Sequence, residues 1–69
     1  MHIELEIKAE AARQRIPLGE LATRMGTYPE RLSRAFNGER EFKTSEIEKA
    51  ADALGLPAWE LMRRAEVSA

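Results

Sequence analysis

Proline and glycine interrupt this chain at short intervals and divide it into five segments. The interruptions fall at Pro17, Gly26, Gly38 and the pair Gly55 and Pro57, and both residue types end or turn regular secondary structure. We expect a helix in each segment. The predicted ranges are about 3–15, 18–25, 28–37, 45–54 and 58–66. In a chain of 69 residues, this pattern favours one small all-α domain, residues 1–69, folded as a compact five-helix bundle.

The first segment admits two interpretations. Residues 3–8, Ile-Glu-Leu-Glu-Ile-Lys, alternate apolar and charged side chains, as a half-buried strand does. Ile3, Ile7 and Ala11 also follow helical spacing, and good helix formers continue to Arg13 without a turn signal. We favour the helix because the run continues, and the strand stays open as the alternative.

Residues typical of helix ends flank the middle segments. Thr27 and Glu30 have the spacing of a capping box, in which each side chain bonds the other residue's backbone N–H. Ser45 and Glu48 have the same spacing. Gly38 is expected to end helix 28–37 in a left-handed conformation.

Apolar side chains recur along one face of each expected helix. The residues that we expect in the core are Ile7, Ile16, Leu21, Met25, Leu32, Phe36, Phe42, Ile47, Leu54, Leu56 and Trp59. Leu61, Met62 and Val67 are expected instead to leave an apolar patch near the C-terminus that serves dimerisation.

Composition excludes several classes of function. The chain has no cysteine, so it forms neither disulfides nor thiolate metal sites, and its lone histidine is His2. No glycine-rich phosphate loop follows a strand, and the carboxylates fall on charged helix faces. We therefore expect no enzyme activity, no catalytic residue, no metal, no cofactor and no small-molecule substrate. No apolar run approaches the ~20 residues of a membrane span, so we expect a cytoplasmic protein without a membrane partner.

Three residues in the second and third segments have the spacing of a helix-turn-helix. Two helices that cross steeply after a short turn need a small residue at the crossing, a turn residue that tolerates positive φ, and an apolar anchor on the second helix. Ala22, Gly26 and Leu32 supply these in that order. The alternative is a helical hairpin in an ordinary bundle, which does not require all three spacings.

The stretch Leu18 to Thr27, LGELATRMGT, and the sequence Phe-Asn-Gly at 36–38 resemble the helix-turn-helix of the phage-repressor family, the lambda-repressor-like and Cro-like DNA-binding domains. The tail at 47–61 resembles the fourth and fifth helices of that family, so the resemblance spans about 16–62. It implies a five-helix lambda-repressor-like bundle with the helix-turn-helix at helices 2 and 3. It also implies a cytoplasmic, nucleoid-associated transcription regulator that binds a two-fold double-stranded DNA operator as a homodimer.

The resemblance places helix 28–37 in the major groove, with its N-terminal end first. The base-contact candidates, which face away from the expected core, are Tyr28, Pro29, Glu30, Ser33 and Arg34. Arg34 leads this set because its guanidinium can bond both O6 and N7 of guanine. Glu30 is also explained by the capping box. Tyr28, Pro29 and Glu30 depart from the family, which often has glutamines early in this helix.

Other polar residues around that helix are candidates for phosphate contacts, which position a protein without reading the sequence. They are Arg24, Thr27, Arg31, Asn37, Arg40 and Lys43. The resemblance supports Asn37 in this role. The alternative for the arginines and Lys43 is an ordinary solvated surface charge.

A protein-binding helix-turn-helix module, such as an antitoxin or an adaptor, is the alternative function. The net charge of −1 favours it, because nucleic-acid binding is typically accompanied by a basic excess. Leu18 favours it too, since the family often has at this position a glutamine that touches the DNA backbone.

Overall fold

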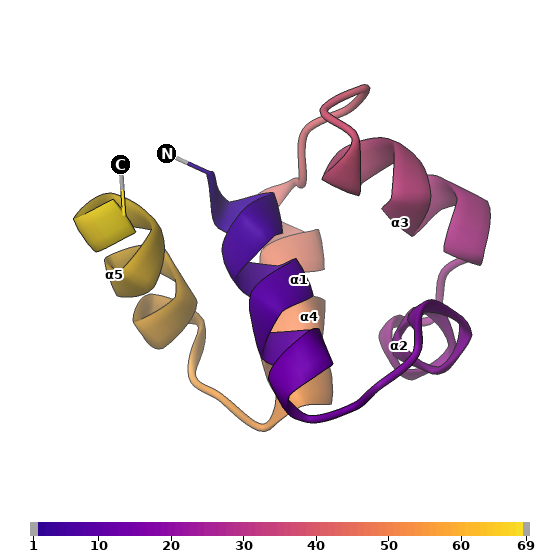
Figure 1. Ribbon diagram of the computed structural model, residues 1–69, viewed down its shortest axis with the longest axis horizontal. Coiled ribbons are helices and arrows are strands. Elements are labelled where there is room, and N and C mark those ends of the chain that lie inside the picture. Colours follow the sequence, from indigo (N-terminus) through magenta and orange to yellow (C-terminus); the bar gives the residue numbers. More distant parts are fainter. Residues whose placement is uncertain (1, 69) are drawn as a thin grey trace.

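Each of the five segments that proline and glycine delimit is helical, which confirms the all-α class (Figure 1). The computed structural model describes residues 2–68, which form α1 (Ile3–Arg13), α2 (Leu18–Met25), α3 (Pro29–Phe36), α4 (Thr44–Leu54) and α5 (Ala58–Ser68). Helices α1 and α4 lie side by side in the centre. Helix α5 packs on one side of this pair, and α2 and α3 pack on the other. Among residues 2–68, no helix is both long enough and apolar enough to cross a membrane.

The strand alternative for residues 3–8 is wrong, because this segment is the first part of α1. A strand would place Ile3, Leu5 and Ile7 on one face. In α1 the buried residues are Ile3, Ile7 and Ala11, whereas Leu5 is 49% exposed. The helix therefore buries the stripe that follows helical spacing, against α5, α3 and α4.

The core lies where the apolar stripes of all five helices meet. The largest fully buried side chains are those of Ile7, Leu21, Leu32 and Leu61. Five of the expected core residues lie at the edge of this core and are only partly buried: Ile16, Phe36, Phe42, Ile47 and Leu56. The rings of Phe36 and Phe42 meet edge to face, with centroids 6.0 Å apart, and so join α3 to the segment before α4.

Trp59 is not in the core, and this expectation is wrong. Its side chain is 63% exposed, whereas Leu61 is fully buried. The buried face of α5 runs through Ala58, Leu61, Met62 and Ala65, which is the complete i, i+3, i+4, i+7 pattern of an amphipathic helix. The predicted patch of Leu61, Met62 and Val67 is wrong for the same reason, since only Val67, 75% exposed, stays at the surface.

Left-handed residues end the first four helices. Gly26, Gly38 and Gly55 have φ values of 72°, 80° and 73°, which confirms the predicted role of Gly38. After each of them, the next backbone N–H returns to a carbonyl five residues earlier, as in Thr27 N to Ala22 O at 2.9 Å. At the end of α1 the same position is taken by Arg15, with φ 58°, although a side chain disfavours this conformation.

The capping box predicted at Thr27 and Glu30 is absent. Helix α3 begins at Pro29, its N-cap is Tyr28, and no side chain caps it. Proline has no N–H and suits the first helical position, so Thr27 falls one residue too early to cap. Its own N–H belongs instead to the end of α2, through the bond to Ala22.

The capping box predicted at Ser45 and Glu48 is also wrong, because α4 begins one residue earlier than expected. The N-cap is Lys43, and the third helical residue is Glu46. The carboxylate of Glu46 accepts a hydrogen bond from the Lys43 backbone N–H at 3.0 Å. A lysine side chain has no acceptor, so only the carboxylate half of the motif caps this helix.

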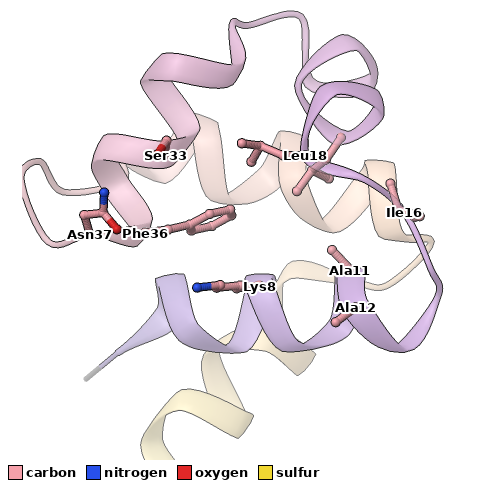
Figure 2. A pocket seen from close by; sticks show the side chains of 9 residues that line it. Lys8, Ala11, Ala12, Ile16, Leu18, Ser33, Phe36 and Asn37 are labelled. Atoms are coloured by element: carbon pink, nitrogen blue, oxygen red, sulfur yellow. The ribbon is translucent and has the colours of Figure 1, made fainter.

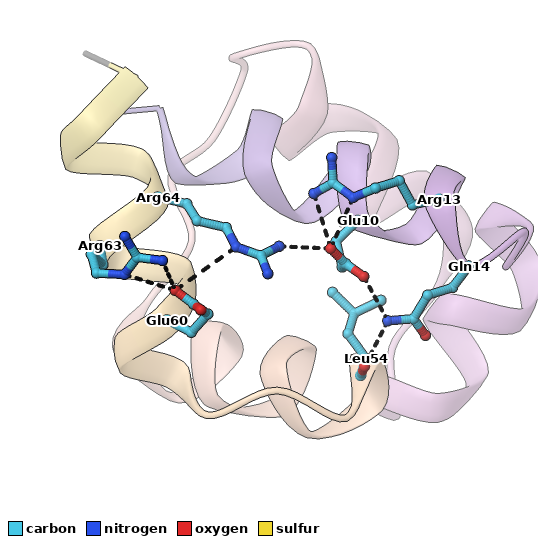
Figure 3. A network of polar contacts seen from close by, with 7 residues as sticks. All are labelled: Glu10, Arg13, Gln14, Leu54, Glu60, Arg63 and Arg64. Atoms are coloured by element: carbon cyan, nitrogen blue, oxygen red, sulfur yellow. Dashed lines mark hydrogen bonds and ion pairs between the residues drawn. The ribbon is translucent and has the colours of Figure 1, made fainter.

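A network centred on Glu10 joins α1 to α4 and α5 (Figure 3). The Glu10 carboxylate accepts hydrogen bonds from Gln14 at 2.9 Å and from Arg64 at 2.6 Å. Gln14 also donates to the Leu54 carbonyl at 2.7 Å. The bonds from Gln14, Arg64 and then Arg13 lower the pKa of Glu10 from 4.5 to about 2. This network anchors α5 to α1. Helices α2 and α3 lie on the opposite side of α1 and α4.

Candidate nucleic-acid interface

The outer face of α3 carries the five base-contact candidates. Leu32 and Ala35 turn into the core, and on the other side Tyr28, Pro29, Glu30 and Arg34 are exposed. Ser33 is half-buried. Tyr28 is 72% exposed. Four of the five candidates are therefore exposed at the N-cap and on the outer side of α3, and Ser33 is exposed in part.

Two shallow hollows flank this face of α3. Glu30 and Arg34 line both of them and so form the ridge between them. The first hollow continues over Pro29 and Ser33 to Leu18 at the start of α2. The second hollow is lined by Tyr28, Glu30, Arg31, Arg34 and Arg40. Three guanidinium groups thus border one concave surface. Two carboxylates lie beside them: Glu30 lines the hollow, and Glu46 pairs with Arg31 and Arg40.

Of the three arginines on this surface, Arg34 has no side-chain partner among residues 2–68. No hydrogen bond or ion pair holds its guanidinium among these residues, whereas Arg31 and Arg40 both have a carboxylate partner. A free guanidinium on an exposed helix face can meet a planar acceptor pair without first breaking an internal contact.

Arg40 and Arg31 share the carboxylate of Glu46. Arg40 donates to both oxygens of Glu46, at 3.0 and 2.8 Å, and the Nε atom of Arg31 lies 3.5 Å from Glu46 Oε2. The bond from Arg40, helped by the Lys43 N–H and by the charge of Arg31, lowers the pKa of Glu46 from 4.5 to about 2. The same bond raises the pKa of Arg40. This arrangement holds Arg40, which follows α3, close to Arg31 within α3 and neutralises part of the charge of both.

The remaining phosphate candidates lie in three different places. Arg24 donates to the Ala53 carbonyl at 3.1 Å and pairs with Glu20, so its contacts are with α2 and α4 and not with the α3 face. Thr27 and Lys43 line a hollow at the start of α4. Asn37 lies at the end of α3, on the side that faces α1.

Two lysines that the sequence analysis did not select lie beside these residues. Lys49 borders the hollow with Thr27 and Lys43. Lys8 borders a groove together with Ser33 and Asn37. The helical spacing of Lys8 with Ala11 and Ala12 placed these three on one face of α1, but nothing in the sequence shows that this face lies against the end of α3.

Comparisons with known proteins give no relative for this chain: no family model, no curated protein and no solved structure matches it.

Proposed function

We propose that this protein binds double-stranded DNA sequence-specifically, with α2 and α3 as a lambda-repressor-like helix-turn-helix and with α3 in the major groove. The internal geometry of the two helices supports this. Ala22 is 1% exposed and Leu32 is 0% exposed, as expected for the crossing point and the anchor. Gly26, in the turn between them, has φ 72°. The resemblance to phage repressors over about 16–62 points the same way.

The single observation that carries the proposal is the position of Arg34. It lies on the exposed side of α3 opposite Leu32, without an internal partner among residues 2–68, and it borders one hollow with Arg31 and Arg40. With its side chains an α-helix is roughly 10–12 Å across, which fits a major groove about 12 Å wide. In that groove Arg34 would bond guanine, while the flanking arginines would contact phosphates.

One copy of this surface makes a small interface, and tight binding by such a module requires two copies on two half-sites. We therefore propose that the protein acts as a homodimer on a palindromic operator, as a transcription regulator.

The test is selection of bound duplexes from a random pool at low salt. We expect an enriched palindrome with guanine at the position that Arg34 reads. Arg34→Ala should lose ~1–3 kcal/mol of discrimination at that base pair. Arg63→Ala is the matched control, because Arg63 is exposed on α5 and pairs with Glu60, so it should keep the selected sequence. Recovery of no enriched palindrome by the unaltered protein would contradict the proposal.

The exposed Trp59 favours a second candidate function, a protein-binding module such as an antitoxin or an adaptor. Trp59 is 63% exposed, and exposed tryptophans are common anchors of protein interfaces. Its helix, α5, lies on the other side of α1 and α4 from α3. A module of this kind would bind its partner through α5, and Trp59→Ala would abolish that binding while Arg34→Ala would not.

A further inference from the structure

A groove of about 290 Å³ lies between α1, the start of α2 and the end of α3 (Figure 2). Its floor is formed by Ala11 and Ala12 of α1, and its walls by Ile16, Leu18 and Phe36. The small methyl groups of Ala11 and Ala12 leave space between this part of α1 and the side chains of Leu18 and Phe36. Most of its lining is apolar carbon, so a ligand that fills it gains the free energy of burying its own apolar surface.

Polar groups lie at only one end of this groove. The Lys8 side chain runs along α1 beneath Phe36 toward that end, where Asn37 also lies (Figure 2). Ser33 of α3 also lines the groove, on the other side of the Phe36 side chain from Lys8. No ion pair or hydrogen bond engages the Lys8 ammonium within residues 2–68, and no carboxylate lines the groove. The end of the groove is therefore a cationic position with the neutral amide of Asn37 at the same end.

We propose that this groove binds a small organic carboxylate with an aromatic or branched apolar body. The carboxylate would pair with the Lys8 ammonium and accept a hydrogen bond from the Asn37 amide, as charge-assisted bonds favour. The apolar body would lie between the Ala12 methyl group and the Phe36 ring. The volume lies at the lower limit of ordinary ligand pockets, about 300 Å³, and so selects a ligand of about one ring. The inference rests on the groove alone and does not depend on DNA binding.

Phenylacetate tests the inference, with the neutral phenylacetamide as its matched probe. Titration of the full chain, followed by amide NMR shifts, should give saturable shifts confined to residues that line the groove. Phenylacetamide should bind more weakly, because it lacks the charge that Lys8 recognises. The absence of saturable shifts at the groove, or equal affinities for the two probes, would overturn the proposal.

Two variants separate the roles of charge and shape. Lys8→Met keeps the aliphatic stem and should weaken phenylacetate binding about fivefold, the size of a partly solvated ion pair. Lys49→Met makes the same charge change on α4 and should leave binding unchanged. Ala12→Leu fills the groove from an exposed position and should abolish binding of both probes, with the fold checked by circular dichroism. Unchanged affinity in Lys8→Met, or binding retained by folded Ala12→Leu, would refute the assignment.

Discussion

The carboxylate of Glu46 holds the guanidinium of Arg40 by two hydrogen bonds, at 2.8 and 3.0 Å. This pair lies at the border between the cap of α4 and the exposed face of α3, and Arg31 approaches the same carboxylate. The Glu46 side chain is 13% exposed and that of Arg40 is 20% exposed, so the pair is partly shielded from water. Two of the arginines proposed to contact phosphate are therefore paired with a carboxylate before any DNA arrives.

Glu46→Gln should increase affinity for duplex DNA at low salt. The amide keeps the size of the side chain but removes the negative charge, so Arg31 and Arg40 become free to neutralise phosphates. Each additional neutralised phosphate steepens the dependence of log K on log salt by about 0.9. Fluorescence anisotropy with the selected duplex over a salt series would measure both quantities.

Glu39→Gln is the control for this change, because it removes the same charge from an exposed residue just after α3. It should raise affinity less, since Glu39 holds no arginine of the α3 face among the described residues 2–68. Equal gains in the two variants would show that only total charge matters and that the Glu46 pairing has no specific effect.

Arg15→Gly should stabilise the protein by about 0.5–1 kcal/mol, because a left-handed conformation costs a side-chain-bearing residue more than it costs glycine. Arg15 has φ 58° at the end of α1. The reverse change at the end of α4, Gly55→Ala, should destabilise by about 1 kcal/mol. A Cβ atom at Gly55 meets nothing within 4 Å, so this cost comes from the backbone alone. Urea denaturation followed by circular dichroism measures the free energy of unfolding of both variants. A loss of stability in Arg15→Gly would contradict the expectation that the left-handed conformation costs arginine more than glycine.

Leu61→Ala and Trp59→Ala should have very different effects on the free energy of unfolding. Leu61 is 0% exposed and Trp59 is 63% exposed. Truncation of the buried leucine should cost about 2–4 kcal/mol, whereas the exposed tryptophan should change stability by no more than about 0.5 kcal/mol. Thermal unfolding by circular dichroism distinguishes them. A larger loss for Trp59→Ala would mean that α5 buries the opposite face.

The helices were predictable from sequence because breakers and apolar spacing act locally. Gly26 and Gly38 end helices for a conformational reason that does not depend on tertiary contacts. The face that α5 buries was not predictable with the same certainty, since two overlapping stripes exist. Trp59, Met62 and Ala65 form one, and Ala58, Leu61, Met62 and Ala65 form the other. Packing against α1 and α4 selects the second.

The helix starts were mispredicted because a cap depends on which residue comes first in the helix. Pro29 moved the start of α3 past Thr27, and the start of α4 at Thr44 gave the capping role to Glu46 instead of Glu48. The site was predictable where it lies on one helix, as the face of α3 shows. The pairing of Arg40 with Glu46 and the position of Lys8 beside Asn37 depend on how the elements pack, which no local pattern encodes.

Acidification should destabilise the protein between about pH 5 and pH 2. The pKa values of Glu10 and Glu46 both fall from 4.5 to about 2 in the folded chain. Unfolding returns each carboxyl to its ordinary pKa, so in this window the unfolded chain binds more protons and the free energy of unfolding decreases. The stabilisation is fully present above the unfolded pKa of about 4.5. Because solvent reaches the partners Arg64 and Arg40, which are 28% and 20% exposed, we expect the two carboxylates together to contribute roughly 1–2 kcal/mol.

The double variant Glu10→Gln and Glu46→Gln isolates this contribution from that of the other carboxylates. It should be less stable than the unaltered protein at pH 7 and should lose less stability on going to pH 3. Urea denaturation at a series of pH values gives the free energy of unfolding at pH 7 and its decrease on going to pH 3. Glu4→Gln and Glu48→Gln together remove the same charge from residues with other surroundings, and this pair should keep the steep dependence. If both double variants followed the same pH curve, the stabilisation could not reside in the Arg64 and Arg40 contacts, because only the first pair removes their carboxylate partners.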